Sequence, residues 1–472
     1  MAMRPLLLLP EMLLFVGGLA ALISGSFLPR ERQWVSRLVA AAALVACVVA
    51  AMIGLTSTAQ TAFEGTFSVD TPTGVARIVA AVGTLIVLSL AVDEITGSPR
   101  ESETYALLLF STTGTLMLAG ADDLLVLAVG FLLTSIPLYG LIGLRRTPAG
   151  AEAAMKTYLL GALFGILLLS GVTVLYGITG TTSYAALPDL LIDAPTGAMA
   201  AGVIGVLAGL MFKAGAVPGH FWIPDAAQGA GGAVAAFLTT VPKIGAVIAT
   251  YRLVDMLPGT LNWPLLIAVL AFASMTLGNL AAYWQTDPRR LLGWSTVSQV
   301  GYLLVPVAVA GRSDSALPSL LLYVAGYTLT NLAAFSVTTA LPQRRTLESY
   351  GRLARAQPML AAALVISLLG LVGTPPTIVF VGKLTIASAA WDGGLAWLAV
   401  AVFANTLISL FYYLRWIVPV FKSDADASPP RADEGASSSP RPASSVVAVV
   451  AALGSLAMGI CAGLLLSLLT GT

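Results

Sequence analysis

The residues most able to carry out chemistry are lysines that lie inside apolar segments. Of the 24 basic residues only five are lysines, and Lys213, Lys243 and Lys383 each stand in a stretch apolar enough to sit in lipid. Arginine, which this chain uses almost everywhere else, stays protonated under physiological conditions, whereas a buried lysine can lose its proton. The placement predicts that these three lysines titrate and are steps of a proton path through a membrane protein.

A second interpretation requires no titration, because lysine can also snorkel to a membrane interface or be less costly to bury than arginine. An ionisable residue inside a membrane segment is nevertheless a functional-site hypothesis by default. The proton path is therefore our prediction, and snorkelling is its alternative.

Prolines interrupt the apolar segments around these lysines. Proline removes a backbone donor and clashes with the preceding helical turn, so it breaks or kinks a helix. Broken membrane helices free backbone groups that can hold water, and they give a segment two possible arrangements. The helix breaks predicted beside the lysines are at Pro218, Pro242, Pro375 and Pro376.

Two further ionisable residues lie in or beside apolar segments. His220, the only histidine, lies where the first broken segment meets its linker, and the sequence leaves open whether it is a proton relay or a hydrogen-bonded hinge. Glu11 is the one carboxylate well inside a predicted span. Because Glu11 lies beside Pro10 near the outer end of the first helix, we expect a role at the interface or in helix packing rather than in transport.

Composition excludes several classes of protein. With 472 residues, 57% hydrophobic and 10% charged, the chain cannot be a soluble globular protein, for which about 25% charged residues are typical. A net charge of +1 excludes electrostatic capture of nucleic acid as its main role. One histidine and two separated cysteines, Cys47 and Cys461, cannot by themselves hold haem or an iron–sulfur cluster, so we expect no cofactor on this chain. Any electron transfer must occur in a partner.

The apolar stretches predict an all-α membrane protein. A helix needs about 20 apolar residues to cross the hydrocarbon core, which gives about 14 transmembrane helices here. We expect the first helix to be retained rather than cleaved as a signal peptide, because Pro10 and Glu11 interrupt its apolar core. The predicted spans are about 5–26, 35–56, 73–93, 103–120, 122–144, 153–178, 197–217, 232–254, 263–284, 290–310, 317–340, 357–390, 395–421 and 444–470.

Basic residues are unevenly divided between the two sides of this arrangement. Arg4, Arg252, Arg312 and Arg77 fall on one side, and most other basic residues fall on the second. The positive-inside bias places the second side in the cytoplasm and both termini outside. Between spans, 57–73 is predicted to be a polar external loop, and the Ser/Pro-rich, charged stretch near 422–443 a flexible cytoplasmic linker.

The two halves of the chain show a weak internal similarity. A polar run at 111–115 leads through an Asp-containing turn to a helix with a Leu-Tyr-Gly sequence, and the run 274–276 leads in the same way to a helix with Gly301 and Tyr302. Each half then reaches a proline-broken helix with a central lysine, Lys213 or Lys383. Paired interrupted helices in corresponding places of two halves point to the ion site of a transporter.

Several longer stretches carry a family resemblance. They are FKAGAVPGHFWIPDAAQG (212–229), VPKIGAV (241–247), GNLAAYWQTDPRRLLGWSTVSQVGY (278–302), YVAGYTLTNLAAF (323–335), LLGLVGTPPTIVFVGKL (368–384) and ANTLISLFYYLRWI (404–417). Through them the chain resembles the antiporter-like membrane subunits of respiratory complex I and the related Mrp-type sodium/proton antiporters. The start LLPEMLLFVGG (8–18) looks like the N-type subunit of bacterial NADH–quinone oxidoreductase rather than its L or M relatives.

The resemblance implies a fold of fourteen helices with two inverted five-helix repeats that contain broken helices. It implies that Lys213, Lys243 and Lys383 belong to the broken seventh, the eighth and the broken twelfth helices of a proton path. It also implies a place in the bacterial plasma membrane, beside other membrane-arm subunits and a peripheral redox arm. NADH, FMN, iron–sulfur clusters and quinone are then expected only in partner subunits. The implied segments are an N-terminal three-helix segment (1–100), a first antiporter-like repeat (101–256), a second (257–421), the linker (422–443) and a C-terminal transmembrane helix (444–472).

The sequence departs from the family pattern at three positions. Leu132 stands where the fifth helix of relatives normally carries a glutamate that pairs with the seventh-helix lysine. Gln299 replaces a histidine common in the tenth helix, and Gln228 replaces an acidic residue after the Trp-x-Pro-Asp segment. Asp122 is no substitute for the glutamate, because ten helical residues place it about 15 Å away along the axis. Either a neighbouring subunit supplies the acid, or the input half-channel is altered or closed.

Three functions remain open from the sequence. The first is a proton-translocating subunit of a complex I-like assembly, with no redox centre of its own. The second is a structural membrane subunit whose own channel is impaired at Leu132. The third is an Mrp-type sodium/proton antiporter subunit, although no intramembrane carboxylate offers sodium a hard oxygen ligand.

Overall fold

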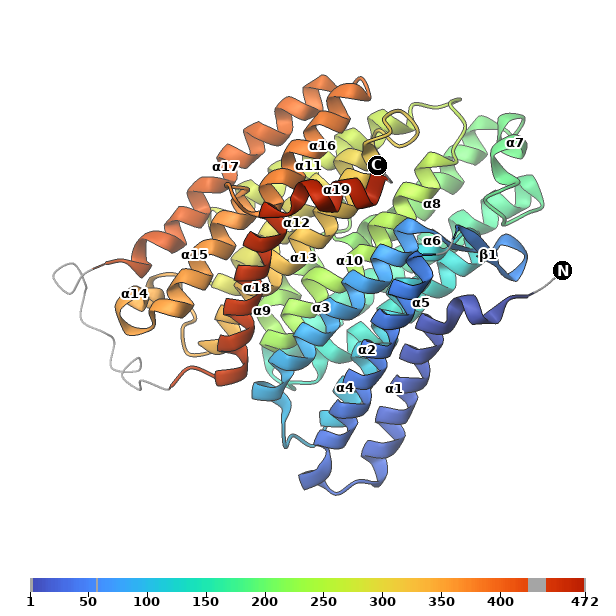
Figure 1. Cartoon of the computed structure of the whole chain (residues 1–472). Helices are drawn as coiled ribbons and strands as arrows, with labels where there is room; N and C mark the ends of the chain where they lie inside the picture. Colours follow the sequence, from blue (N-terminus) through green and yellow to red (C-terminus); the bar gives the residue numbers. More distant parts are fainter. Residues whose placement is uncertain (1–2, 57, 423–438, 471–472) are drawn as a thin grey trace.

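A computed structural model describes residues 3–56, 58–422 and 439–470, and helices make up most of them (Figure 1). The helices up to the middle of the chain are α1 (Leu9–Phe27), α2 (Trp34–Leu55), α3 (Thr71–Ile95), α4 (Glu101–Gly120), α5 (Leu124–Gly143), α6 (Pro148–Thr179), α7 (Leu187–Ile192), α8 (Thr196–Ala214), α9 (Trp222–Gly229) and α10 (Gly232–Asp255). The later helices are α11 (Trp263–Ala282), α12 (Pro288–Val307), α13 (Ala316–Ala340), α14 (Leu353–Ala356), α15 (Pro358–Val372), α16 (Ile378–Asp392), α17 (Ala396–Val420), α18 (Pro442–Ile460) and α19 (Ala462–Thr470). Strands β1 (Gln60–Ala62) and β2 (Phe67–Val69) form an antiparallel hairpin, and the short 3-10 helices are Pro5–Leu8, Arg30–Arg32, Phe63–Gly65 and Glu348–Tyr350.

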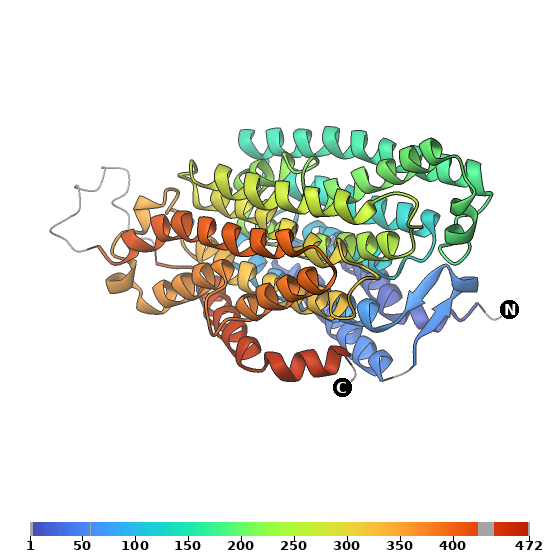
Figure 2. The same ribbon diagram turned by 90° about the horizontal axis from the view of Figure 1, so that it is seen from above.

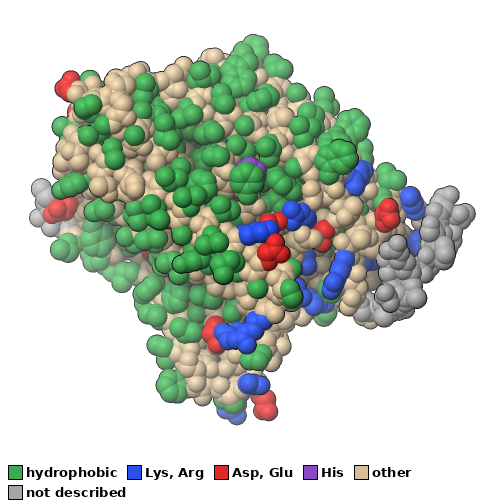
Figure 3. All heavy atoms as spheres, turned by 180° about the vertical axis from the view of Figure 1, so that it is seen from behind, with side chains coloured by type: hydrophobic (Ala, Val, Ile, Leu, Met, Phe, Trp, Pro, Cys, Tyr) green, Lys and Arg blue, Asp and Glu red, His purple; other side chains and the backbone are tan. Residues whose placement is uncertain are grey.

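The long helices lie side by side in both views (Figures 1 and 2). Among the described residues, eleven helices are long and apolar enough to cross a membrane, judged by length and composition. Hydrophobic side chains cover much of the face in Figure 3, and its Lys and Arg side chains gather toward one side. The prediction of an all-α membrane protein is confirmed at this level.

The β-hairpin marks one end of the bundle, which we call the hairpin end. Phe67 of the hairpin pairs with Ala121 after α4, and Asp123 pairs with Ser183 in the loop after α6. These contacts join three loops into one layer across the hairpin end. The segment 57–73, predicted as a polar loop, therefore contains this hairpin and the first residues of α3; residue 57 lies outside the described residues.

Helices α10 and α13 form the centre of the bundle. Among the apolar windows of the spans, 100% of the α10 window and 89% of the α13 window are buried, against 22% around α2. Gly245 lets α10 approach α4 closely, since a Cβ there would lie 2.2 Å from the Thr115 carbonyl oxygen. The helix that carries Lys243 is therefore surrounded by protein on all sides.

A buried ion pair holds α1 against α3 near the hairpin end. Arg77 donates to the two carboxylate oxygens of Glu11 at 2.8 Å each and to the Leu7 carbonyl oxygen at 2.9 Å. Both charged side chains are 3% exposed. Glu11 packs helices, in line with the sequence expectation. Its partner Arg77, which the sequence places among the outer arginines, lies inside the bundle.

Two sequence predictions about helix interruption are wrong. Helix α10 continues through Pro242, so no break occurs there. In the turn before this proline, the Thr239 carbonyl oxygen accepts a hydrogen bond from the Tyr327 hydroxyl at 2.7 Å. The carbonyl that Pro242 leaves without its helical donor is that of Leu238, four residues earlier. Proline is tolerated in membrane helices that are packed among other helices, and the α10 window is fully buried. The predicted C-terminal helix is two helices, α18 and α19, which meet at Cys461 and differ in direction (Figures 1 and 2).

The predicted linker 422–443 lies mostly outside the described residues, which resume at 439. Its last part is already structured, because α18 begins at Pro442. Proline suits this position, since the first helical residue needs no backbone donor.

The Arg77–Glu11 pair generates the first prediction. Arg77→Met leaves the Glu11 carboxylate buried without its partner, and we expect a loss on the order of 3–5 kcal/mol in unfolding free energy. A lower thermal unfolding midpoint of the purified protein in detergent would report this loss. The double variant Glu11→Leu/Arg77→Met buries no charge and should recover most of the midpoint. An equal loss in the single and double variants would contradict the importance of the pair.

Candidate functional site

The three lysines singled out by the sequence are all buried. Their exposed fractions are 1% for Lys213, 1% for Lys243 and 3% for Lys383. Within the described ranges, none of the three takes part in a salt bridge, and each donates instead to a backbone carbonyl or a hydroxyl group. The arrangement therefore buries three amines without carboxylate partners.

The break between α8 and α9 creates the acceptor for Lys243. Helix α8 ends at Ala214 because Gly215 adopts φ +84° and ψ 31°, in the left-handed region that glycine tolerates. The Ala214 carbonyl oxygen accepts a hydrogen bond from Lys243 Nζ at 2.7 Å. A Cβ at position 215 would lie 2.9 Å from that nitrogen, so glycine also leaves room for the amine.

Lys213 lies one residue before that carbonyl and contacts α5. Its Nζ donates to Ser135 Oγ at 3.1 Å. The neighbouring Thr134 carbonyl accepts from the Ser111 hydroxyl at 2.9 Å, which extends the polar contacts into α4. Leu132, one turn earlier on α5, is 40% exposed on the outside of the bundle. Lys213 is therefore held by a hydroxyl group rather than an acid.

The break between α15 and α16 holds Lys383 in a similar way. Helix α15 ends at Val372, and Gly373 adopts φ +91°. Lys383 Nζ donates to the Val372 carbonyl oxygen at 2.9 Å and lies 4.0 Å from the centroid of the Tyr302 ring. The C-terminal end of a helix carries partial negative charge, and an aromatic face attracts a cation. Both breaks therefore offer partial negative charge to an amine.

The two breaks share the spacing Gly-x-x-Pro, at Gly215–Pro218 and at Gly373–Pro376. Their lysines do not correspond, however. Lys213 precedes its glycine by two residues, whereas Lys383 follows its glycine by ten. By this count the first-half counterpart of Lys383 is Asp225, which follows Gly215 by ten residues.

Polar side chains of α12 and α13 connect the helix of Lys243 to the second break. Tyr327 donates to the Thr239 carbonyl oxygen, one turn before Lys243, at 2.7 Å and to Thr296 Oγ1 on α12 at 3.2 Å. Asn331, one turn further along α13, donates to Thr239 Oγ1 at 3.1 Å.

Gln299 continues the connection along α12, one turn after Thr296. Its amide oxygen accepts a hydrogen bond from Tyr323, and its amide nitrogen donates to the Leu371 carbonyl oxygen at 2.9 Å. Lys383 Nζ lies 3.4 Å from the same carbonyl oxygen. We call the side chains of Thr239, Thr296, Gln299, Tyr323, Tyr327 and Asn331 the polar corridor. It consists of two groups, one beside the helix of Lys243 and one beside Lys383, that lie one turn apart on α12 and on α13.

His220 lies in the linker between α8 and α9 and is 2% exposed. Its ring packs against those of Phe221 and Trp294, tilted by 33° and 55°, with centroid separations of 4.1 Å and 5.6 Å. Neither ring nitrogen has a hydrogen-bond partner among the described residues, and the same holds for Trp294 Nε1. Whether His220 is a proton relay or a hydrogen-bonded hinge stays a prediction.

Gln228 belongs to a charged cluster at the end opposite the hairpin. Asp225 on α9 accepts hydrogen bonds from Lys156 on α6, at 2.9 Å, and from Arg290 on α12. Arg290 also donates to the Gln228 side-chain oxygen at 3.1 Å. The cluster ties the second half of the broken helix to two neighbouring helices. Gln228 is therefore an end contact of Arg290, and Lys213 donates to Ser135 instead.

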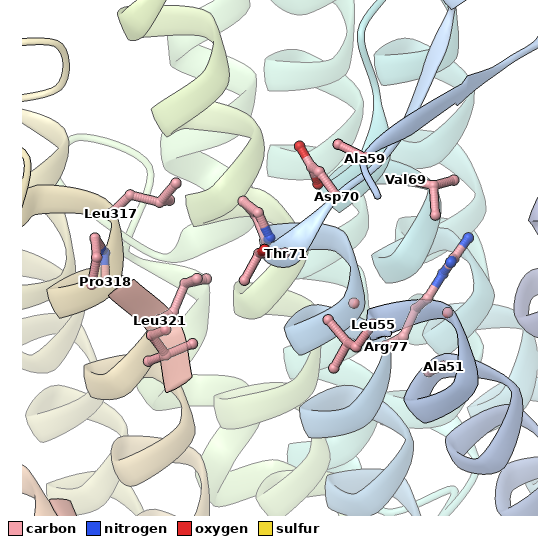
Figure 4. A pocket seen from close by; sticks show the side chains of 14 residues that line it. Ala51, Leu55, Ala59, Val69, Asp70, Thr71, Arg77, Leu317, Pro318 and Leu321 are labelled. Atoms are coloured by element: carbon pink, nitrogen blue, oxygen red, sulfur yellow. The ribbon is translucent and has the colours of Figure 1, made fainter. Parts of the chain in front are cut away.

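A cavity of about 240 Å³ lies near the hairpin end, between α2, α3, α13 and α19 (Figure 4). Asp70, Thr71 and Arg77 supply its polar lining, and residues such as Leu321 and Leu469 supply the apolar part. None of the three buried lysines lines this cavity, so it is separate from the candidate proton path.

Sequence reasoning missed Ser135 and every member of the polar corridor except Gln299. The available signal was helical spacing, because Tyr323, Tyr327 and Asn331 recur every four residues and so share one face of α13. That pattern shows a polar face inside an apolar helix, but it does not show which helix the face meets.

Comparison with known proteins finds a family of membrane subunits that the chain resembles over most of its length. The profile of a family described as NADH:quinone oxidoreductase/Mrp antiporter, TM matches residues 121–409. The chain is 63% identical to NADH-quinone oxidoreductase subunit N of Mycobacterium sp. (strain JLS), over 99% of each chain.

Two solved structures have the same fold. A chain of respiratory complex I from Thermus thermophilus matches with a TM-score of 0.81 and 29% identity, covering 97% of this chain and 98% of the other. A chain of the Mrp complex from Dietzia sp. DQ12-45-1b matches with a TM-score of 0.84 and 24% identity, covering 98% and 96%. The second likeness concerns the fold alone.

The absence of salt bridges at the lysines generates the second prediction. Lys243→Met removes an amine that no carboxylate neutralises, so relief from burying its charge should offset the lost hydrogen bond of about 1 kcal/mol. We expect an unchanged or higher thermal unfolding midpoint, in contrast to the lower midpoint of Arg77→Met. A fall as large as that of Arg77→Met would show that Lys243 has a structural role.

Proposed function

Because the chain belongs to the NADH:quinone oxidoreductase/Mrp antiporter family of membrane subunits, we propose that it is a proton-translocating membrane subunit of a complex I-like NADH–quinone oxidoreductase. The observation that carries the proposal is the polar corridor between two buried lysines that have no carboxylate partners. A subunit with only a structural role would need neither the buried amines nor the polar corridor.

In this mechanism the three amines are resting places for the proton. Lys213 and Lys243 are coupled, since Lys243 binds the carbonyl oxygen of the residue next to Lys213. Like charges on these two buried amines repel each other in a medium of low dielectric constant, so a proton on one amine disfavours a proton on the other. A proton that enters at Lys213 therefore drives the proton of Lys243 onward.

The onward step follows the polar corridor toward Lys383. Hydroxyl groups both donate and accept hydrogen bonds, so Tyr327 and Thr296 can pass a proton by exchanging partners, with water completing the chain. Gln299 holds Tyr323 and shares the Leu371 carbonyl oxygen with Lys383. The Gln299 side chain does not titrate, so it orients its neighbours and carries no proton.

We infer fourteen membrane crossings, with α8–α9 and α15–α16 each counted as one broken span and α18 as the last. The charge bias of the loops supports an arrangement with the hairpin end and both termini outside and the Asp225 cluster in the cytoplasm. Two inverted five-helix repeats, 101–256 and 257–421, are supported by the shared Gly-x-x-Pro spacing of the breaks.

The energy for transport comes from redox chemistry in partner subunits. Other membrane-arm subunits and a peripheral arm are the proposed partners, and NADH, FMN, iron–sulfur clusters and quinone are assigned to them. The Mrp-type alternative is not favoured. Among the described residues no carboxylate accompanies the buried lysines, and sodium prefers such hard oxygen ligands.

The third prediction tests the lysines directly. In membrane vesicles that contain the assembled complex, Lys243→Ala and Lys383→Ala should each abolish the proton uptake that this subunit couples to quinone reduction. Lys243→Arg should not restore uptake, because arginine does not release its proton. Lys422→Ala, at an exposed position, is the matched control and should pump normally. Normal uptake in both alanine variants would rule out the proposed function.

The fourth prediction separates a pumping subunit from a structural one. The second candidate is favoured by one observation, that Lys213 contacts Ser135 and no acid. If the native subunit pumps, Leu132→Glu should leave the number of protons taken up per quinone unchanged or lower. An increase in that number would show that the native channel is silent and that the new carboxylate restores it.

A further inference from the structure

Helix α18 is a long helix to which the proposed proton path assigns no task. Its outward face is exposed, with exposed fractions of 62% for Val446, 62% for Val450 and 55% for Leu453. Its inward face consists of small residues, which let helix backbones approach closely in membranes. These buried residues are Ser444, Ala448, Ala451, Ala452 and Ser455.

One end of α18 rests on the backbone of the second break. A Cβ at Gly459 would lie 1.9 Å from the Pro376 carbonyl oxygen and 2.7 Å from the Ile378 nitrogen, so no larger residue fits without movement. One turn earlier, Ser455 Oγ and Thr330 Oγ1 on α13 form a buried hydrogen bond of 2.7 Å. The register of α18 against α13 therefore determines where its end meets the break.

The other end of α18 is attached to the end of α3. The Asp93 carboxylate accepts from the backbone N–H and the hydroxyl of Ser444 at 2.7 Å and 2.8 Å. The next residue, Glu94, accepts from the backbone N–H groups of Gly232 and Ala233 at 3.1 Å and 2.9 Å. Carboxylates stabilise helix N-termini, where the backbone donors are free. Two adjacent acids therefore hold the first turns of α18 and of α10, the helix of Lys243.

We propose that α18 is a positioning element that keeps the second break, and with it Lys383, in register with the helix of Lys243. Asp93 and Glu94 set the two helix N-termini relative to each other, and Gly459 transmits the position of α18 to Pro376. The Val372 carbonyl oxygen that holds Lys383 belongs to the same break, so a displaced break moves the acceptor of the amine. The consequence for transport rests on the proposed function, whereas the positioning itself does not.

Gly459→Ala in the assembled complex tests the contact at the break. The added methyl group should raise amide hydrogen exchange at Thr377 and Ile378 about tenfold, the change that corresponds to about 1.4 kcal/mol of lost local stability. It should also lower the number of protons taken up per quinone while the rate of quinone reduction is retained. Gly463→Ala is the matched control, because nothing lies within 4 Å of a Cβ there, and it should change neither quantity.

Asp93→Asn tests transmission along α18 and remains usable if Gly459→Ala fails to assemble. It keeps the size of the side chain but weakens the two hydrogen bonds from Ser444. We expect faster exchange at Thr377 and Ile378, far from the substitution, and a smaller loss of coupling. Unchanged exchange at the break in this variant would overturn the positioning role. Faster exchange with unchanged proton uptake would keep the positioning role and overturn the proposed function.

Discussion

The structure depends on one constraint: three amines are buried in a membrane protein without carboxylate partners. Moving an ammonium group out of water costs several kcal/mol even after the surroundings relax. Here the compensation comes from partial charges, since Lys243 and Lys383 each bind a carbonyl oxygen at the end of a half-helix. Such an oxygen also tolerates the neutral amine, whereas a carboxylate would be left as an uncompensated charge. The site therefore suits a group that changes its protonation state.

A side chain with a permanent charge is buried in this protein with a carboxylate partner. Arg77 cannot release its proton, and it is buried against Glu11 with two short hydrogen bonds. The Arg77–Glu11 pair contributes to stability, whereas the lysines without carboxylate partners belong to the proposed proton path. This contrast also explains why the irregular backbone is concentrated at Gly215 and Gly373, because an unbroken helix has no free carbonyl oxygen at mid-length to offer.

Much of the fold and the presence of lysines in its apolar interior could be predicted from sequence, because they depend on local composition. Long apolar stretches indicate the helices, and lysine in a chain that otherwise uses arginine indicates Lys213, Lys243 and Lys383. The partners could not be predicted, because helical spacing shows which face is polar and not which helix it meets. Ser135 lies 78 residues from Lys213, and Tyr327 lies 88 residues from Thr239. Pro242 was misjudged for a similar reason, since the protein that surrounds α10 on all sides comes from helices distant in sequence.

The resemblance implies three departures from the family pattern, and one of them, Gln299, lies in the polar corridor. Gln299 stands where the resemblance implies an imidazole, whereas Leu132 is 40% exposed on the outside of the bundle. Every hydrogen-bonding group that the described contacts place between Lys243 and Lys383 is then neutral: hydroxyl, amide or backbone carbonyl. On the proposed path a proton has no titrating side chain between the two amines, so the proposal requires it to cross from Lys243 to Lys383 in one event. Proton transfer then depends more strongly on the position of Lys383 relative to Lys243 than it would with a titrating side chain between them. A helix that sets this position, as proposed for α18, therefore affects the coupling of proton uptake to quinone reduction.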